Sequence, residues 1–182
     1  MTQAPIDSKS VTDRLALVRQ CLEDLRALPA TTLVEFLGDR RNAHAADSLL
    51  RRSIEALFDT ARHLLARGFS LGALEYREVA RKASEKGLVT DPDLARRFVQ
   101  IAGFRNRLTH HYENVTPEEL FEVLRRDLGD LAALVDAMAE ATSRLTFCNP
   151  FLPERILWER TALGDEFDER YAYWNLDPEQ HL

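Results

Sequence analysis

A short stretch near residue 105 places an arginine and two histidines where an apolar helix face is expected. Apolar residues recur at spacings of three and four through Phe98 and Ile101, and the same spacing next reaches Arg105. A guanidinium group on a packing face costs free energy unless it is paired, so this break in the pattern marks a candidate functional site. His110 and His111 follow directly, and their imidazoles titrate near neutral pH.

Two other interpretations of these residues remain open from the sequence. An ion pair with a buried carboxylate such as Asp59 would give Arg105 a purely structural role. The adjacent histidines invite a metal-binding interpretation, but neighbouring residues on a helix point about 100° apart. Cys21 and Cys148 stand alone in the chain, without the Cys or Cys/His spacing of a zinc site. We therefore expect neither a metal nor a cofactor.

Helices are the elements that must position these side chains, because apolar residues recur with helical spacing along most of the chain. Pro29, Gly68 and Gly87 are the expected stops of the first three long helices. The predicted helices span about 10–28, 42–67, 72–86, 91 through the motif, and 117–145, with a possible short helix at 33–37.

The starts of the last two helices carry clear capping signals. Asp91 followed by Pro92 is an N-cap with proline at the first helical position. Thr116, Pro117 and Glu119 combine a capping box with the same proline placement. No segment shows strand alternation of comparable length. The sequence therefore predicts an all-α protein, an antiparallel bundle of about five helices.

The C-terminal part of the chain differs in composition from the rest. Seven of the 15 aromatic residues fall at position 147 or later. We expect two parts, a helical bundle over residues 1–145 and an aromatic-rich extension over 146–182. The rings of the extension would pack on the bundle, or alternatively form a surface for a partner or a second copy.

Composition narrows the possible functions. No stretch reaches the roughly 18 apolar residues of a membrane span, and the N-terminus lacks the apolar core of a signal peptide, so we expect a cytoplasmic protein without membrane contact. The net charge of −6 argues against nucleic-acid binding over the whole surface. It still permits a local basic cleft, and all but three of the 24 basic residues are arginines, whose planar fork suits phosphate.

The stretch FRNRLTHHY, residues 104–112, resembles the R-x4-H-x-Y motif of the HepT family, whose usual form is close to FRN-x-L-x-H-x-Y. The resemblance continues upstream through RRSIEALFDTARHLLARG and EYREVARKASEKGLV, and downstream through the helix after Thr116. It covers roughly residues 30–145. The R-x4-H pattern alone is common by chance, but the full motif at the end of the fourth long helix of an all-helical chain is much more specific.

The resemblance implies a HEPN-like homodimer whose two motifs face a shared cleft. It implies a metal-independent ribonuclease toxin restrained by an MNT-type nucleotidyltransferase antitoxin. His110 would move a proton at the 2′-hydroxyl or the leaving 5′-oxygen, and Arg105 would stabilise the charge on the phosphorane. Asn106 would orient the phosphate, hold Arg105, or serve only in structural hydrogen bonding. Tyr112 would be the residue to which the antitoxin adds AMP.

Helix geometry leaves one difficulty for this assignment. At about 100° per residue, Arg105 and His110 lie about 140° apart on an ideal helix and cannot both face one phosphate. Either the helix frays or bends before His110, or a dimer completes the site. A catalytically silent HEPN domain that binds RNA, nucleotide or a nucleotidyltransferase is the main alternative function, followed by a helical bundle without a ligand.

Overall fold

The computed structural model describes residues 5–110 and 115–147 of the chain, which form seven α-helices and no strand. The helices are α1 (Ser8–Ala27), α2 (Leu33–Leu37), α3 (Arg40–Phe69), α4 (Tyr76–Glu85), α5 (Pro92–His110), α6 (Pro117–Arg126) and α7 (Leu128–Phe147). They confirm the predicted all-α class. The predicted extension over 146–182 lies outside the described residues apart from its first two, so its packing stays a prediction.

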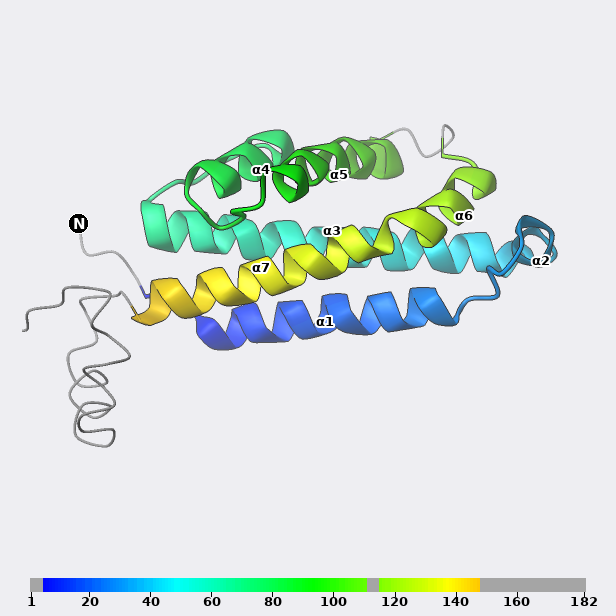
Figure 1. Ribbon diagram of the computed structural model, residues 1–182, viewed down its shortest axis with the longest axis horizontal. Coiled ribbons are helices and arrows are strands. Elements are labelled where there is room, and N and C mark those ends of the chain that lie inside the picture. Colours follow the sequence, from blue (N-terminus) through cyan, green and yellow to red (C-terminus); the bar gives the residue numbers. More distant parts are fainter. Residues whose placement is uncertain (1–4, 111–114, 148–182) are drawn as a thin grey trace, which may run out of the picture. The chain divides into compact units, whose positions relative to one another are not determined.

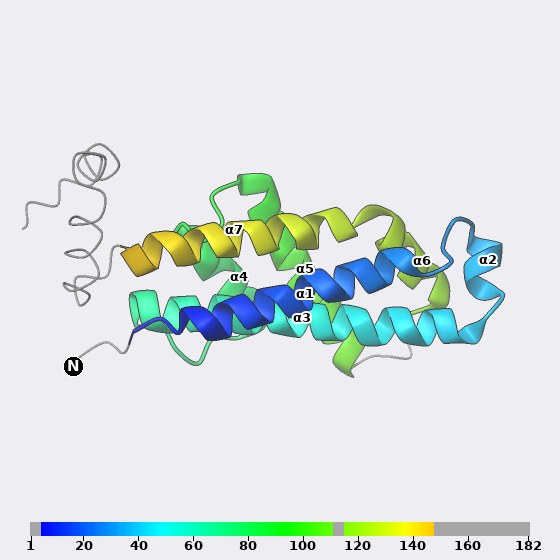
Figure 2. The same cartoon turned by 90° about the horizontal axis from the view of Figure 1, so that it is seen from below.

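The long helices pack as an antiparallel bundle around α3. Helices α1, α3 and α7 lie side by side, with α1 antiparallel to the other two, and α4 and α5 pack together against α3 (Figures 1 and 2). The short helix α2 and α6 meet each other and α3 at the end of the bundle where α3 begins. No helix among the described residues is long and apolar enough to cross a membrane.

The capping signals in the sequence are largely confirmed. The carboxylate of Asp91 accepts from the backbone N–H of Asp93 at 2.8 Å, and the hydroxyl of Thr116 accepts from the N–H of Glu119 at 3.2 Å. The first helix ends at Ala27, before Pro29, as predicted.

Three predicted boundaries are wrong. Helix α3 passes through Gly68 and ends at Phe69, where Ser70 takes a left-handed conformation with φ of 57°. Helix α4 begins at Tyr76 rather than near residue 72. The single helix predicted over 117–145 is two helices, because a turn at Asp127 interrupts the helix between α6 and α7. Apolar spacing continues across that break, which explains why the sequence pattern conceals it.

Three aromatic rings fix the positions of α3, α4 and α5 relative to one another. Phe58 of α3 stacks on Phe98 of α5, with ring centroids 4.6 Å apart, and meets the edge of Tyr76 of α4 at 5.1 Å. Phe58 and Phe98 are fully buried. The rings therefore anchor α5 two helical turns before Arg105, which lies seven residues after Phe98.

Candidate functional site around Arg105

Arg105 lies on the core-facing stripe of α5, as its spacing from Phe98 predicts. Leu108, one turn further on, is fully buried, whereas the Arg105 side chain keeps 15% of its surface exposed. The guanidinium group therefore sits at the edge of the core. It is enclosed enough for electrostatic interactions to be stronger than in water, yet remains accessible to a ligand.

Two residues from other helices hold the Arg105 side chain. Its Nε–H donates to Oε1 of Glu55 on α3 at 2.5 Å, and its Cζ lies 3.9 Å from the centroid of the Tyr76 ring on α4. The Tyr76 hydroxyl donates to the other oxygen of Glu55, Oε2, at 2.8 Å. Glu55, Tyr76 and Arg105 thus form one closed set of contacts across three helices.

The carboxylate that pairs with Arg105 is Glu55 rather than the expected Asp59. Asp59 lies one turn further along α3 and pairs with Arg62 at 3.1 Å. The Glu55 side chain keeps 36% of its surface exposed, so this is not a fully buried ion pair. Glu55 engages only Nε of Arg105, and the two terminal nitrogens have no hydrogen-bond partner among the described residues. These are the nitrogens with which arginine binds phosphate.

Tyr76 provides an aromatic platform for two cations. The guanidinium of Arg62 also lies over its ring, 4.1 Å from the centroid. Burial raises the pKa of the Tyr76 phenol above its ordinary value, with Arg62 acting in the opposite direction. The phenol is therefore neutral at physiological pH and can donate its hydrogen bond to Glu55.

The other predicted site residues are placed only in part. Asn106 is exposed and has no hydrogen-bond partner in the part of the chain that the structure describes, so it does not hold Arg105 there. Helix α5 continues through His110, so the helix does not end before that residue. The His110 side chain, His111 and Tyr112 lie outside the described residues, and their roles stay predictions.

An ion pair joins the two helices that flank the motif's last residues. Both terminal nitrogens of Arg107 on α5 donate to the carboxylate of Glu119 in the first turn of α6, at 3.2 and 2.5 Å. The carboxylate of Glu119 thus pairs with Arg107. In the sequence, residues 111–114, which include Tyr112, lie between these two paired residues.

A hollow of about 230 Å³ is lined by residues of α3, α5, α6 and α7, and Arg105 is not among them. Its lining includes Ile54, Ile101 and Phe104, together with the Arg107–Glu119 pair. Asn106 is likewise not among its described lining residues. Among residues 5–110 and 115–147, no cluster of three or more His, Cys, Asp or Glu side chains could hold a metal ion.

Sequence reasoning missed Glu55 and Tyr76 as members of the site. Both fall in the segments that carry the family resemblance, RRSIEALFDTARHLLARG and EYREVARKASEKGLV. Their location in these two segments was the only signal in the sequence that could have pointed to them. Nothing local distinguishes Glu55 from Asp59, because the two carboxylates stand one turn apart on the same side of one helix.

Comparison with known proteins agrees with this fold. Residues 18–138 of the chain match the family described as "Ribonuclease HepT-like". A tRNA nuclease HepT from Aphanizomenon flos-aquae (strain 2012/KM1/D3) is 25% identical over 116 residues, covering 64% of this chain and 78% of that protein.

Solved structures show the same fold. A tri-AMPylated Shewanella oneidensis HEPN toxin, in complex with its MNT antitoxin, superimposes with a TM-score of 0.64 at 19% identity, covering 72% of this chain and 97% of that one. A toxin–antitoxin structure with AMP-PNP gives 0.63 at 19% identity and covers 71% and 97%. The fold is therefore that of a HEPN-type helical bundle. Because the family match spans more than half of its residues, the chain belongs to the ribonuclease HepT-like family.

Proposed function

We propose that this protein is a metal-independent endoribonuclease toxin of a HEPN/MNT toxin–antitoxin pair, active as a homodimer. Its family membership supports the ribonuclease class. The observation that carries the proposal is the state of Arg105: Glu55 fixes its Nε, while its terminal nitrogens remain without partners among the described residues. A side chain held in this way is preorganised to bind a phosphate with two parallel hydrogen bonds.

The proposed reaction needs no redox step and no cofactor. The 2′-hydroxyl of RNA attacks the adjacent phosphorus, the bond to the 5′-oxygen breaks, and a 2′,3′-cyclic phosphate forms. One group removes the proton of the attacking hydroxyl and one protonates the leaving oxygen. His110 suits either role, and Arg105 stabilises the charge on the phosphorane. Asn106, exposed one residue after Arg105, is available to orient the phosphate.

The geometry of α5 supports completion of the site by a second copy. Because α5 continues through His110, the positions of Arg105 and His110 stay about 140° apart around the helix. A dimer that brings two motifs to one cleft would let Arg105 of one copy work with His110 of the other.

One observation favours the alternative of a catalytically silent HEPN domain. The Glu55 carboxylate offsets the charge of Arg105, as a structural ion pair would. Expression of the chain in a bacterium that lacks the antitoxin separates the two functions, with growth and total RNA integrity as readouts.

Wild type should arrest growth and degrade RNA, whereas Arg105→Ala and His110→Ala should do neither while keeping the helical circular-dichroism spectrum. The matched controls are Arg96→Ala and His44→Ala, which change exposed side chains and should remain toxic. Cleavage by the purified protein should survive EDTA. Full activity of His110→Ala, or loss of cleavage on chelation, would refute the mechanism.

A further inference from the structure

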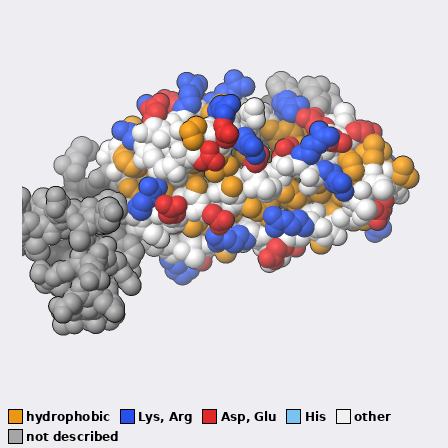
Figure 3. All heavy atoms as spheres, viewed as in Figure 1, with side chains coloured by type: hydrophobic (Ala, Val, Ile, Leu, Met, Phe, Trp, Pro, Cys, Tyr) orange, Lys and Arg blue, Asp and Glu red, His pale blue; other side chains and the backbone are white. Residues whose placement is uncertain are grey.

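Basic side chains gather at the start of α1 and the end of α3, although the protein is acidic overall. The side chains lining a shallow hollow of about 510 Å³ there are Arg14, Asp59, Arg62, His63, Ala66 and Arg67. Three arginines thus face a single carboxylate in a protein with a net charge of −6. Over the face shown in Figure 3, positive and negative side chains are interspersed. We call the surface formed by Arg14, Arg62, His63 and Arg67 the basic groove.

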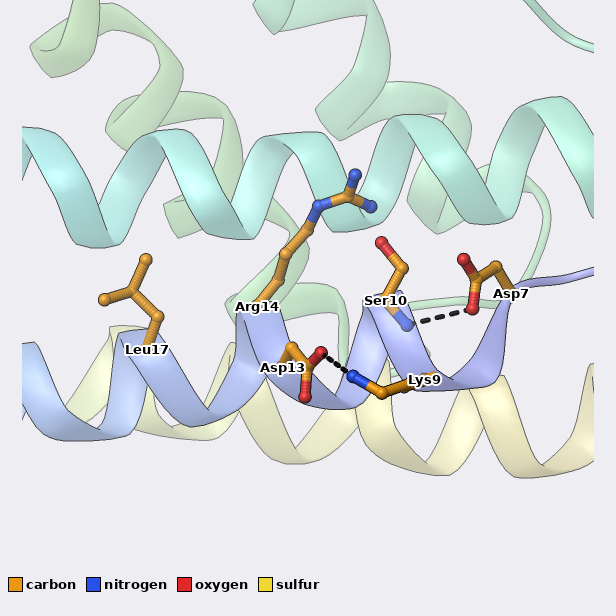
Figure 4. A pocket seen from close by; sticks show the side chains of 6 residues that line it. All are labelled: Asp7, Lys9, Ser10, Asp13, Arg14 and Leu17. Carbon is orange, nitrogen blue, oxygen red and sulfur yellow. Dashed lines mark hydrogen bonds and ion pairs between the residues drawn. The ribbon is translucent and has the colours of Figure 1, made fainter.

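Arg14 has a donor that nothing in the described structure satisfies. Its side chain extends from α1 towards α3, whereas the nearby Lys9 pairs with Asp13 along α1 itself (Figure 4). The Nη1 atom of Arg14 is enclosed by protein and has no acceptor among the described residues. The Arg14 side chain makes no hydrogen bond or ion pair with any described residue, so its positive charge is available to an anion in the hollow.

Of the other two arginines in the basic groove, Arg62 pairs with Asp59 at 3.1 Å. Arg67 is exposed and has no ion-pair partner within residues 5–110 and 115–147. His63 accepts a hydrogen bond from the backbone N–H of Asp7 at 3.1 Å, which leaves its Nε2 without a proton. Burial, then Arg14 and Arg67, lower the pKa of His63, with Asp7 acting in the opposite direction. An anion in the basic groove would offset the repulsion among Arg14, Arg62 and Arg67.

Arg62 links the basic groove to the candidate site. It lines the groove, and its guanidinium lies over the Tyr76 ring that Arg105 also contacts. A ligand that places one phosphate at Arg105 and continues past Tyr76 would therefore meet Arg62 and then Arg14 and Arg67. The hollow is shallow, which suits an extended chain with repeated anionic groups better than an enclosed small molecule.

We propose that the basic groove binds backbone phosphates of the RNA strand, at positions away from the bond that is cleaved. The chemistry is that of guanidinium forks on phosphodiesters, which is independent of base sequence. This proposal rests on the proposed ribonuclease function, because it assumes that the strand is the one held at Arg105. It assigns Arg14 and Arg67 to substrate affinity and gives them no part in the reaction itself.

The test measures binding without cleavage. Fluorescence anisotropy with a single-stranded 2′-O-methyl RNA, which lacks the attacking hydroxyl, compares the full chain with the double variant Arg14→Gln/Arg67→Gln. Affinity should fall on the order of tenfold. The slope of log affinity against log salt should become shallower by about 0.7 for each phosphate that is no longer neutralised, or about 1.4 for the double variant.

Arg26→Gln/Arg40→Gln is the matched control. It removes the same charge from exposed positions at the other ends of α1 and α3 and should bind as wild type. Arg67→Gln alone keeps the test valid if the double variant is unstable, since its side chain is exposed. Equal weakening in the control and the groove variant would refute the groove as a site. Unchanged RNA binding with weakened antitoxin binding would overturn the proposal in favour of an acidic protein partner.

The outcome is separable from that of the proposed function. If wild type cleaves RNA but the groove variant binds it normally, the groove assignment is wrong and the ribonuclease stands. If wild type binds RNA through the groove but does not cleave it, the groove assignment stands and the ribonuclease does not.

Discussion

Glu55 binds Arg105 and Tyr76 with its two separate oxygens, so one carboxylate of α3 fixes a side chain on each of two other helices. The arrangement leaves the terminal nitrogens of Arg105 free of partners among the described residues. We therefore expect Glu55 to act as a positioning residue in the proposed ribonuclease, one that sets the direction of the Arg105 guanidinium without contacting the substrate.

Removing the charge of Glu55 tests this role. Glu55→Gln should lower kcat about 10- to 100-fold with a smaller change in KM, because a misdirected Arg105 loses more in the transition state than in substrate binding. Glu55→Asp should restore part of the rate. Asp47→Asn, which breaks the Asp47–Arg51 ion pair on the same helix, is the control and should leave kcat unchanged. An unchanged kcat in Glu55→Gln would show that the carboxylate only stabilises the fold.

Two substitutions of Tyr76 separate what its ring and its hydroxyl each contribute to stability. Tyr76→Phe keeps the surface under Arg62 and Arg105 and loses one hydrogen bond to Glu55, so it should lower the free energy of unfolding by about 1 kcal/mol. Tyr76→Leu also removes both cation–π contacts and should cost more stability and more activity. Urea unfolding of the two variants provides the comparison. Equal stabilities would mean that the ring contacts contribute nothing measurable.

The lowered pKa of His63 predicts that the stability of the protein depends on pH. Its pKa is lowered in the folded state by burial, then by Arg14 and Arg67, with Asp7 acting in the opposite direction. Asp59 and Arg62 also line its hollow. The unfolded chain therefore takes up a proton at a higher pH than the folded chain, and stability is lost as pH falls from about 6.5 towards the folded pKa.

Thermal melts at about pH 7.5 and about pH 5 should show this decrease. On acidification the Tm of wild type should fall further than that of His63→Gln. The difference should be a few degrees at most, because the imidazole is only partly buried. The exposed His44→Gln serves as the control and should behave as wild type. A pH-dependent decrease that is identical in His63→Gln would assign the effect to other groups.

The AMP target stays a prediction from the family motif. Incubation with the cognate nucleotidyltransferase, ATP and magnesium should add AMP to Tyr112, which follows the last residue of α5 by two positions in the sequence. The added phosphates should pair with Arg105 in place of RNA and silence cleavage without unfolding the chain. Mass spectrometry locates the modification, and Tyr112→Phe should escape both the label and the inhibition. If the mass maps elsewhere and Tyr112→Phe is still inhibited, this regulatory role is wrong.

The local features of this protein follow from its sequence. Helical spacing of apolar residues placed α1 and α3 within two residues at each end, and the Asp91 and Thr116 caps located the starts of α5 and α6. These features depend on neighbours within about four residues, which is the range of helical hydrogen bonding. The placement of Arg105 on a core-facing stripe is a property of the same kind.

Tertiary packing alone decided which side chains meet Arg105. Glu55 and Asp59 are equivalent in the sequence, since both are acidic and lie one turn apart on α3. The stacking of Phe98 on Phe58 sets how far α5 is displaced along α3, and that displacement brings Arg105 to Glu55 and leaves Asp59 to Arg62. The meeting of Arg14 with the end of α3 is likewise a contact between residues far apart in the chain. Such contacts depend on the packing of whole helices, which no short sequence pattern encodes.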